Sequence, residues 1–244
     1  MSRLFYIVVF FVTLSTVAAT AGELRQVSLT TGPWMPFTGK DLPGYGHAAT
    51  LVSAAFRSES YGVEFHFRPW MRAYAEAKAG RANGSILWRR TGERESHFWY
   101  SEPVLSVDIV FFHLKSRPFD WETLEDLLTV RIGVVRGFKY EDRFDRALQE
   151  GLITAQAVAT QEMNFRKLLK GRIDVFPVVK DSGHATIATS FSQEEADRFT
   201  QHPKPLARHK LYLILTRHLP ENERILADFN RGLARVLNRS ADTR

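Results

Sequence analysis

The sequence predicts an α/β fold, and three observations support this. Short runs rich in β-branched and aromatic residues alternate with longer amphipathic stretches, a pattern typical of parallel strands covered by helices. Polar clusters containing proline, at residues 115–118 and 202–205, interrupt the alternation. The chain of 244 residues is long enough for one large or two modest domains, at about 100–200 residues per domain.

The first residues have the features of an export signal. Arg3 precedes the apolar run 4–12, and residues 19–21 offer the small side chains of a cleavage site before Gly22. The run is shorter than the roughly 20 apolar residues that span a bilayer, and no later segment is apolar for long enough. We therefore expect residues 1–21 to be a cleaved signal peptide of a periplasmic protein. An uncleaved N-terminal anchor is the alternative.

The composition excludes several classes of function. Lysine and arginine outnumber aspartate and glutamate by 33 to 27, giving a net charge of +6. This excess is spread along the chain, so it gives little support for nucleic-acid binding and favours either an anionic ligand or solubility. The absence of cysteine excludes disulfides, thiol catalysis and cysteine-ligated zinc. Without an HExxH motif, a phosphate loop or a defensible Ser-His-Asp order, we expect no catalytic residue, no metal and no cofactor.

The individual elements follow from the spacing of apolar residues. The β-branched and aromatic runs predict strands at 27–31, 63–68, 85–88, 109–114, 130–135, 173–179 and 211–216. The amphipathic stretches between them predict helices at 47–57, 70–79, 121–128, 140–150, 161–170, 193–199 and 222–237.

The two polar clusters are candidate crossings between two lobes. Pro118 ends the strand 109–114, and the cluster 202–205 comes just before the strand 211–216. If both are crossings, residues 22–115 and 208–244 form lobe 1, and residues 116–207 form lobe 2, inserted into lobe 1. Two adjacent crossings make a hinge, and closure around a ligand is a common use of a hinge. The alternative is one continuous α/β domain with a long loop.

Five sequence blocks, in order and at these spacings, resemble a known family. They are Trp34-Met35-Pro36-Phe37; Arg68-Pro69-Trp70 with Gly80-Arg81-Ala82-Asn83-Gly84; Thr91-Gly92-Glu93-Arg94 before Tyr100-Ser101-Glu102-Pro103; Ile132-Gly133-Val134 with Gly137; and Leu168 before Gly171-Arg172-Ile173-Asp174-Val175. The chain resembles the extracellular solute-binding proteins of the polar-amino-acid branch, family 3, which serve ABC importers. The resemblance covers residues 27–236 and implies a two-lobed type II periplasmic binding protein fold that encloses its ligand between the lobes.

The resemblance makes Arg94 the first candidate for a ligand contact. In the family, the arginine of the Thr-x-x-Arg block binds the ligand carboxylate, and Thr91 and Arg94 occupy the matching positions. A guanidinium suits this role because its planar fork of donors fits a carboxylate and stays charged. The alternative is a surface arginine paired with Glu93 or Glu95.

Aromatic and basic residues complete the expected site on lobe 1. Trp34 follows the first strand, where the family places an aromatic ring against the ligand, whereas we expect Phe37 to be a core residue. A second group consists of Trp70, Arg72, Trp88 and Arg89. Of the last two, we expect only one to face the cleft, because neighbouring strand residues point to opposite faces.

The second lobe departs from the family at two places. Phe138 replaces the usual hydroxyl residue, so backbone N–H groups near Phe138 and Lys139, and the Lys139 charge, are the remaining candidates. Val179 stands where amino-acid binders carry the acid that pairs with the ligand's ammonium. Either Asp181 has taken this role or no ammonium is bound, because a buried ammonium without a partner is costly. We expect Asp174 to stabilise the end of a strand rather than to contact the ligand.

Three functions remain open at this point. We favour capture of a small polar ligand, an amino acid or small carboxylate, for an ABC importer. An orphan ligand sensor or regulatory module is the second, and the missing acid at Val179 favours it. A dehydratase-like enzyme of small acids is the third, since Glu, His and Lys in a cleft could supply acid and base. We expect a monomer whose partners are the ligand and an ABC permease or a membrane sensor.

Overall fold

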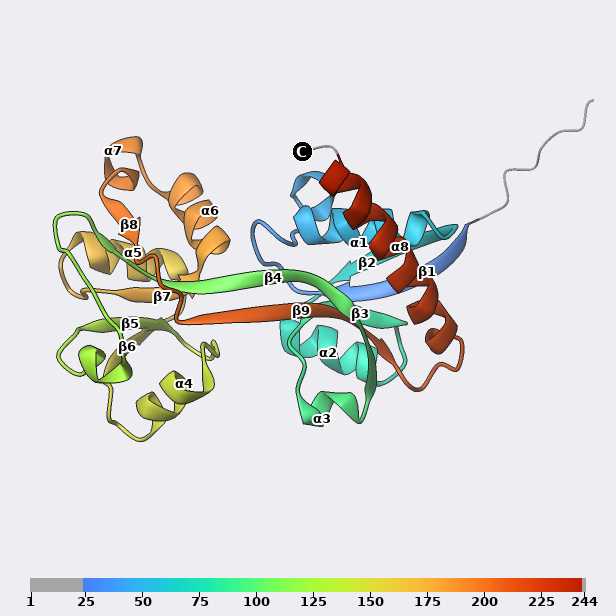
Figure 1. Cartoon of the computed structure of the whole chain (residues 1–244), viewed down its shortest axis with the longest axis horizontal. Coiled ribbons are helices and arrows are strands. Elements are labelled where there is room, and N and C mark those ends of the chain that lie inside the picture. Colours follow the sequence, from blue (N-terminus) through green and yellow to red (C-terminus); the bar gives the residue numbers. More distant parts are fainter. Residues whose placement is uncertain (1–23, 243–244) are drawn as a thin grey trace, which may run out of the picture.

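A computed structural model describes residues 24–242, which form two lobes joined by two long strands (Figure 1). Lobe 1 contains the elements near both chain ends, and lobe 2 contains the elements in the middle of the sequence. The predicted signal peptide at residues 1–21 lies outside the described residues. Within them, no helix combines the length and the apolar character needed to cross a membrane.

Lobe 1 consists of three strands and their covering helices. Its strands are β1 (Arg25–Thr31), β2 (Tyr61–Phe67) and β3 (Gly84–Trp88). Its helices are η1 (Pro43–Tyr45), α1 (His47–Arg57), α2 (Trp70–Lys78), α3 (Gly92–Glu95) and α8 (Asn222–Asp242). Their shared core packs strand residues against α1 and α8, and includes Val27, Leu29, Ile86, Val52, Phe56, Phe229 and Leu233.

Lobe 2 is smaller and centres on a cluster of phenylalanines. Its strands are β5 (Ile132–Val135), β6 (Ala155–Val158), β7 (Phe176–Val179) and β8 (Phe199–Gln201). Its helices are η2 (Leu124–Leu127), α4 (Asp142–Gln149), α5 (Gln161–Leu169), α6 (Lys180–Ser190) and α7 (Gln193–Ala196). The Phe165 ring lies 5.3 Å from the rings of Phe112 and Phe176 and 5.2 Å from Phe199, centroid to centroid.

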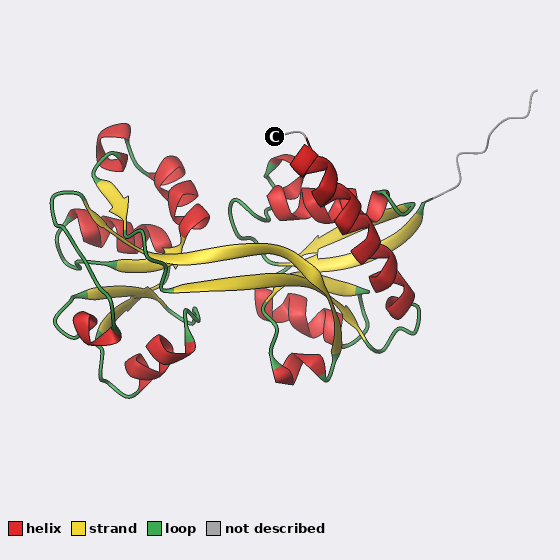
Figure 2. Ribbon diagram, viewed as in Figure 1, coloured by secondary structure: helices red, strands yellow, loops and turns green. Residues whose placement is uncertain are grey.

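Two antiparallel strands, β4 (Phe98–Leu114) and β9 (Ala207–Thr216), connect the lobes (Figure 2). They belong to a seven-stranded sheet with the order β2-β1-β3-β9-β4-β7, in which β8 also pairs with β4. Within β4, residues 109–112 pair with β7 of lobe 2, so the strand enters lobe 2 before residue 115. The lobe boundaries given above stay a prediction.

The structure corrects several predicted elements. The strand predicted at 109–114 begins at Phe98, and its pairing with β9 is antiparallel, whereas the sequence pattern predicted parallel sheets. The helix predicted at 121–128 is only the short 3-10 helix η2, and that at 193–199 ends at Ala196, before β8. Helices α3 and α6 and strands β6 and β8 were not predicted.

Candidate functional site

Three indole rings from three separate elements lie in a row on lobe 1. Trp34 follows β1, Trp70 begins α2 and Trp88 ends β3. The ring centroids of Trp34 and Trp70 are 6.2 Å apart, those of Trp70 and Trp88 are 5.4 Å apart, and both pairs meet edge to face, an arrangement that aromatic pairs favour. Trp34 and Trp70 are half-buried, whereas Trp88 is 8% exposed. We call these three side chains the tryptophan row.

Local backbone features fix the first two rings. A Cβ atom on Gly32 would lie 2.4 Å from Cε2 of Trp70, so the absence of a side chain there lets the indole lie against the backbone. Two backbone hydrogen bonds close the loop after β1. The Trp34 N–H donates to the Thr38 carbonyl at 2.7 Å, and the Thr38 N–H donates to the Trp34 carbonyl at 2.9 Å. Phe37 within this turn is 6% exposed and belongs to the core, which confirms the expectation for it.

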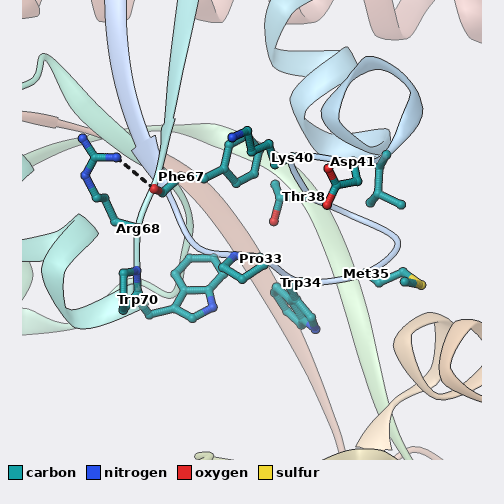
Figure 3. Close-up of a pocket in the computed structure, with 12 residues that line it drawn as sticks. Pro33, Trp34, Met35, Thr38, Lys40, Asp41, Phe67, Arg68 and Trp70 are labelled. Atoms are coloured by element: carbon teal, nitrogen blue, oxygen red, sulfur yellow. Dashed lines mark hydrogen bonds between the residues drawn. The ribbon is translucent and has the colours of Figure 1, made fainter.

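An open groove of about 800 Å³ lies beside Trp34 and Trp70 (Figure 3). Its walls are residues 33–35 and 38–42 of the loop after β1 and residues 67–70 between β2 and α2. Such a volume suits a small molecule. In the view of Figure 3, Arg68 and Asp41 lie at opposite ends of the groove. Arg68 donates from Nη1 to the Phe67 carbonyl at 3.0 Å, and its Nε lies 3.3 Å from Glu76 Oε2.

An unusual backbone conformation ends β3 and separates Trp88 from Arg89. Leu87 is buried and has a φ of 68°, which is rare for a residue with a side chain. The pairing of β3 with β9 shifts register at this residue. Trp88 therefore turns into lobe 1, where its Nε1 donates to Ser85 Oγ at 2.7 Å. Arg89 extends toward lobe 2, and its Nη2 lies 3.7 Å from Asp142 Oδ1.

The Arg94 side chain continues the tryptophan row. Its guanidinium carbon lies 4.9 Å from the centroid of the Trp88 ring and 5.7 Å from that of Tyr74, distances at which a cation is attracted to a ring face. Nη1 donates to the Arg89 carbonyl at 3.0 Å, and the Tyr100 hydroxyl donates to the same oxygen at 3.2 Å. Arg94 is half-buried, and no carboxylate of residues 24–242 forms an ion pair with it.

Thr91 and Arg72 have local partners. Thr91 is the N-cap of α3, and its Oγ1 accepts a bond of 3.4 Å from the Arg94 N–H, so it positions the turn that presents Arg94. Arg72 lies on the exposed side of α2, where its Nε pairs with Glu76 Oε1 at 2.8 Å. A direct contact of either residue with a ligand stays a prediction.

On lobe 2, the turn that leads into α4 carries three acidic residues, and one of them, Asp142, meets Arg89 of lobe 1. Glu141 caps the helix by accepting from the Phe144 N–H at 2.9 Å, and Asp145 accepts from the Tyr140 N–H at 3.1 Å. Burial raises the pKa of Asp145, although this hydrogen bond and Lys139 oppose the shift. Glu141, Asp142 and Asp145 make this helix start unsuitable for an anion, because their negative charge counters the helix dipole.

The same turn uses one of the backbone donors that the sequence suggested for a ligand. The Phe138 N–H donates to the Val135 carbonyl at 3.2 Å, and a contact of this turn with a ligand stays a prediction. The Phe138 ring is half-buried, 4.9 Å from Tyr140. Lys139 is exposed on this turn.

The strand end at Val179 has no acid. Val179 is 2% exposed and pairs with Ile109 of β4, and α6 begins directly after it. Asp181 lies in the first turn of α6 with its side chain exposed. Asp174 accepts from the Arg131 backbone at 3.0 Å and from its Nε at 2.9 Å, as expected for a residue that holds a strand end.

Several site residues were missed by sequence reasoning. Phe67 and Arg68 line the groove, Tyr74 and Tyr100 surround Arg94, and Asp142 meets Arg89 from the other lobe. Burial raises the pKa of Tyr100 to about 12, so its hydroxyl stays a hydrogen-bond donor at neutral pH. Within the described part of the chain, no cluster of three or more metal-binding side chains occurs.

Comparisons with known proteins identify the fold. Neither protein-family models nor curated proteins give a match to the sequence. Among solved structures, a histidine kinase sensor domain with similarity to periplasmic binding proteins is 19% identical, with a TM-score of 0.68 over 90% of this chain and 93% of that one.

Two further structures agree with this likeness. The second substrate-binding domain of a putative amino acid ABC transporter from Streptococcus pneumoniae is 16% identical, with a TM-score of 0.65 over 88% of this chain and 94% of that one. The GluR0 ligand-binding core from Nostoc punctiforme, in complex with L-glutamate, is 16% identical, with a TM-score of 0.64 over the same shares. The chain therefore has the predicted two-lobed type II periplasmic binding protein fold.

Proposed function

We propose that this protein is a periplasmic solute-binding protein that captures a small carboxylate or amino acid for an ABC importer. The observation that carries the proposal is the state of Arg94. Its guanidinium is half-buried and held by two rings and a backbone carbonyl, yet no carboxylate of the described residues neutralises it. Arg94 lies at one end of the tryptophan row, over Trp88, and the other two rings of the row line an open groove. A positioned cation and an aromatic-lined groove on the same row suit an anionic small molecule.

The structural likenesses support the same function. The S. pneumoniae domain belongs to a putative amino acid ABC transporter, and other similar structures hold arginine or glutamate. A periplasmic location rests on the signal peptide expected at residues 1–21. Mass spectrometry of the periplasmic fraction should find a chain that begins near Gly22, whereas an intact N-terminus kept in the membrane would argue against export.

Ligand sensing is a second candidate, favoured by the likeness to a histidine kinase sensor domain. Transport and sensing both begin with binding of the solute. They differ in the partner that recognises the closed, liganded protein. Capture of an ABC permease by the liganded protein in a pull-down would support transport, and capture of a membrane sensor kinase would support sensing. An enzyme of small acids finds less support, because the proteins with similar structures bind ligands.

A thermal-shift screen tests the proposed binding. The mature protein is heated with amino acids, mono- and dicarboxylates and small peptides in turn, and a true ligand raises the melting temperature as its concentration rises. We expect at least one carboxylate-bearing solute to do so, with 1:1 stoichiometry by calorimetry. If no member of the panel stabilises the protein, the proposed function is wrong.

A further inference from the structure

We infer that the solute is a flat, largely apolar carboxylate that has no ammonium group. This inference rests on the proposed function, because it names the chemical class of the ligand for the same site. Three features carry it: the aromatic groove beside Trp34 and Trp70, the unpaired Arg94 at the other end of the tryptophan row, and the engagement of the acidic residues at the start of α4 by the chain itself.

The groove is built for a flat apolar body. Trp34, Trp70 and Phe67 supply its ring faces (Figure 3). Trp70 is held rigidly, with Gly32 on one side and Trp88 5.4 Å away on another. Rigid rings bury apolar surface with few rotors to order, so they favour a flat ligand over a flexible aliphatic chain.

Two arginines, Arg89 and Arg94, lie at one end of the tryptophan row. Arg94 lies at the end of the row, over the Trp88 ring. The backbone carbonyl of Arg89, the residue after Trp88, accepts a hydrogen bond from Arg94. The groove itself contains Lys40, Asp41 and Arg68, and Glu76 pairs with Arg68. Arg94 therefore supplies the site's unneutralised charge among the described residues, and its planar fork fits a carboxylate.

The carboxylates at the start of α4, on lobe 2, already have partners within the chain. Glu141 accepts from the Phe144 N–H, Asp145 from the Tyr140 N–H, and Asp142 pairs with Arg89. The strand end that precedes α6 is the buried, apolar Val179. An ammonium brought into the site would lose water without gaining a buried carboxylate, which is unfavourable. Two exposed acids, Asp41 and Asp181, are the remaining candidates to pair with a ligand ammonium, and substitution of each tests this.

Four probes separate the ring, the carboxylate and the ammonium. 3-Phenylpropionate has the ring and the carboxylate, L-phenylalanine adds an ammonium, 2-phenylethylamine replaces the carboxylate, and butyrate lacks the ring. Isothermal titration of the mature protein should give the tightest binding for 3-phenylpropionate. We expect L-phenylalanine to bind about tenfold more weakly because its ammonium is unpaired, and butyrate about tenfold more weakly because it leaves the groove empty.

Matched variants test the assigned residues. Trp34→Ala should weaken 3-phenylpropionate binding about tenfold. Trp99→Ala, which removes a ring that packs against Arg217 on another part of lobe 1, should leave it unchanged. Asp41→Asn and Asp181→Asn should preserve the preference for 3-phenylpropionate over L-phenylalanine. If either variant weakens L-phenylalanine selectively, that acid pairs with an ammonium, and the inference is overturned.

The outcomes also separate this inference from the proposed function. Tighter binding of L-phenylalanine or 2-phenylethylamine than of 3-phenylpropionate would overturn the ligand class and leave solute capture intact. Equal binding of butyrate and 3-phenylpropionate would overturn the role of the aromatic groove. If none of the four probes binds, the ligand class is wrong, but the proposed function is wrong only if the wider thermal-shift panel also fails.

Discussion

Arg94 has its position fixed before a ligand arrives. Its contacts with Trp88 and Tyr74 and the hydrogen bond to the Arg89 carbonyl restrict its long side chain, while its other guanidinium N–H groups have no hydrogen-bond partner among residues 24–242. A preorganised side chain loses little conformational entropy on binding, so more of the interaction energy appears as affinity. The same contacts explain why a lysine could not replace it fully, since an ammonium lacks the planar fork.

Removal of Arg94 should cost most of the affinity. Arg94→Ala is expected to weaken binding of a carboxylate ligand by about 2–5 kcal/mol, the range for truncation of one partner of a desolvated charge pair. Arg94→Lys should recover part of this loss. Arg166→Ala is the control, because Arg166 pairs with Glu162 on the surface of lobe 2. Calorimetric titration measures all three, and full affinity in Arg94→Ala would show that the carboxylate binds elsewhere.

Asp142 should compete with the ligand carboxylate for the positive charge of Arg89. It lies 3.7 Å from Arg89 across the two lobes, and both side chains are partly exposed, so the pair is weak. Asp142→Asn should therefore tighten carboxylate binding modestly, by up to about 1 kcal/mol, and the gain should shrink at high salt. Titrations at two salt concentrations check this, with the exposed Asp197→Asn as control. A weaker affinity in Asp142→Asn would mean that Asp142 contacts the ligand favourably.

Among single residues, the sequence predicts best those that stand in a local motif. Thr91 and Arg94 stand in a recognisable block, and the family resemblance separated Trp34, which is half-buried, from Phe37, which is a core ring. Their contacts with a ligand stay predictions. The contact between Arg89 and Asp142 could not be predicted, because it depends on how two lobes meet. The engaged N–H of Phe138 depends on the geometry of its turn, which the sequence pattern did not specify.

Among the elements, α8 is tied to β2 by a buried polar contact. The Tyr61 hydroxyl donates to Asp228 Oδ2 at 2.6 Å, and Arg231 also bonds Asp228. Burial alone would raise the pKa of Asp228, but the hydrogen bonds from Tyr61 and Arg231 outweigh it, so the pKa is lowered from 3.8. A depressed pKa means that the folded state favours the ionised carboxylate, so this contact stabilises the fold at neutral pH.

The stability of lobe 1 should depend on pH through Asp228. Its contribution is fully present well above pH 3.8 and is lost as the pH falls through the lower pKa of the folded state. Asp228→Asn should lower the free energy of unfolding at pH 7 by about 1–3 kcal/mol, as for a disrupted buried hydrogen bond. The difference from the parent should shrink in acid. Urea titrations from pH 7 to pH 3 measure it, and a difference that is constant over this range would contradict the assignment.

Element prediction succeeded where helical or strand periodicity is clear. The helix α1 has the predicted bounds, and α2 and α5 differ by one residue at the C-terminal end. Helix α6 was missed because its apolar residues follow no helical period. The start of β4 was missed because Ser101, Glu102 and Pro103 break the strand pattern, and the structure accommodates them through register shifts against β9.

In the whole molecule, one sheet runs through both lobes, and β4 and β9 form the connection (Figure 1). Asp108 and Arg208, opposite each other on these strands, form two hydrogen bonds of 2.6 and 2.9 Å. Nearby, His209 Nε2 lies 2.5 Å from the Tyr140 carbonyl, so β9 also contacts the turn before α4. Bending of two paired strands moves the lobes as units, which is the geometry of hinge closure.

The alternation of strands and helices was enough to predict an α/β fold, whereas the inserted middle segment was predicted from the polar clusters at 115–118 and 202–205. The sequence did not predict that the connecting strands pair antiparallel along most of their length, because pairing depends on residues about a hundred positions apart. We expect this pairing to make the two strands bend together as one hinge rather than as two independent linkers.

The central claim, that a small solute binds between lobes that close on it, is tested most directly by small-angle X-ray scattering. The mature protein is measured alone and with the strongest ligand from the thermal-shift screen at a saturating concentration, with Arg94→Ala as the control. We expect the ligand to reduce the radius of gyration of the parent protein and to leave that of Arg94→Ala unchanged at the same concentration. An unchanged radius in the saturated parent protein would mean that the lobes do not close on the ligand.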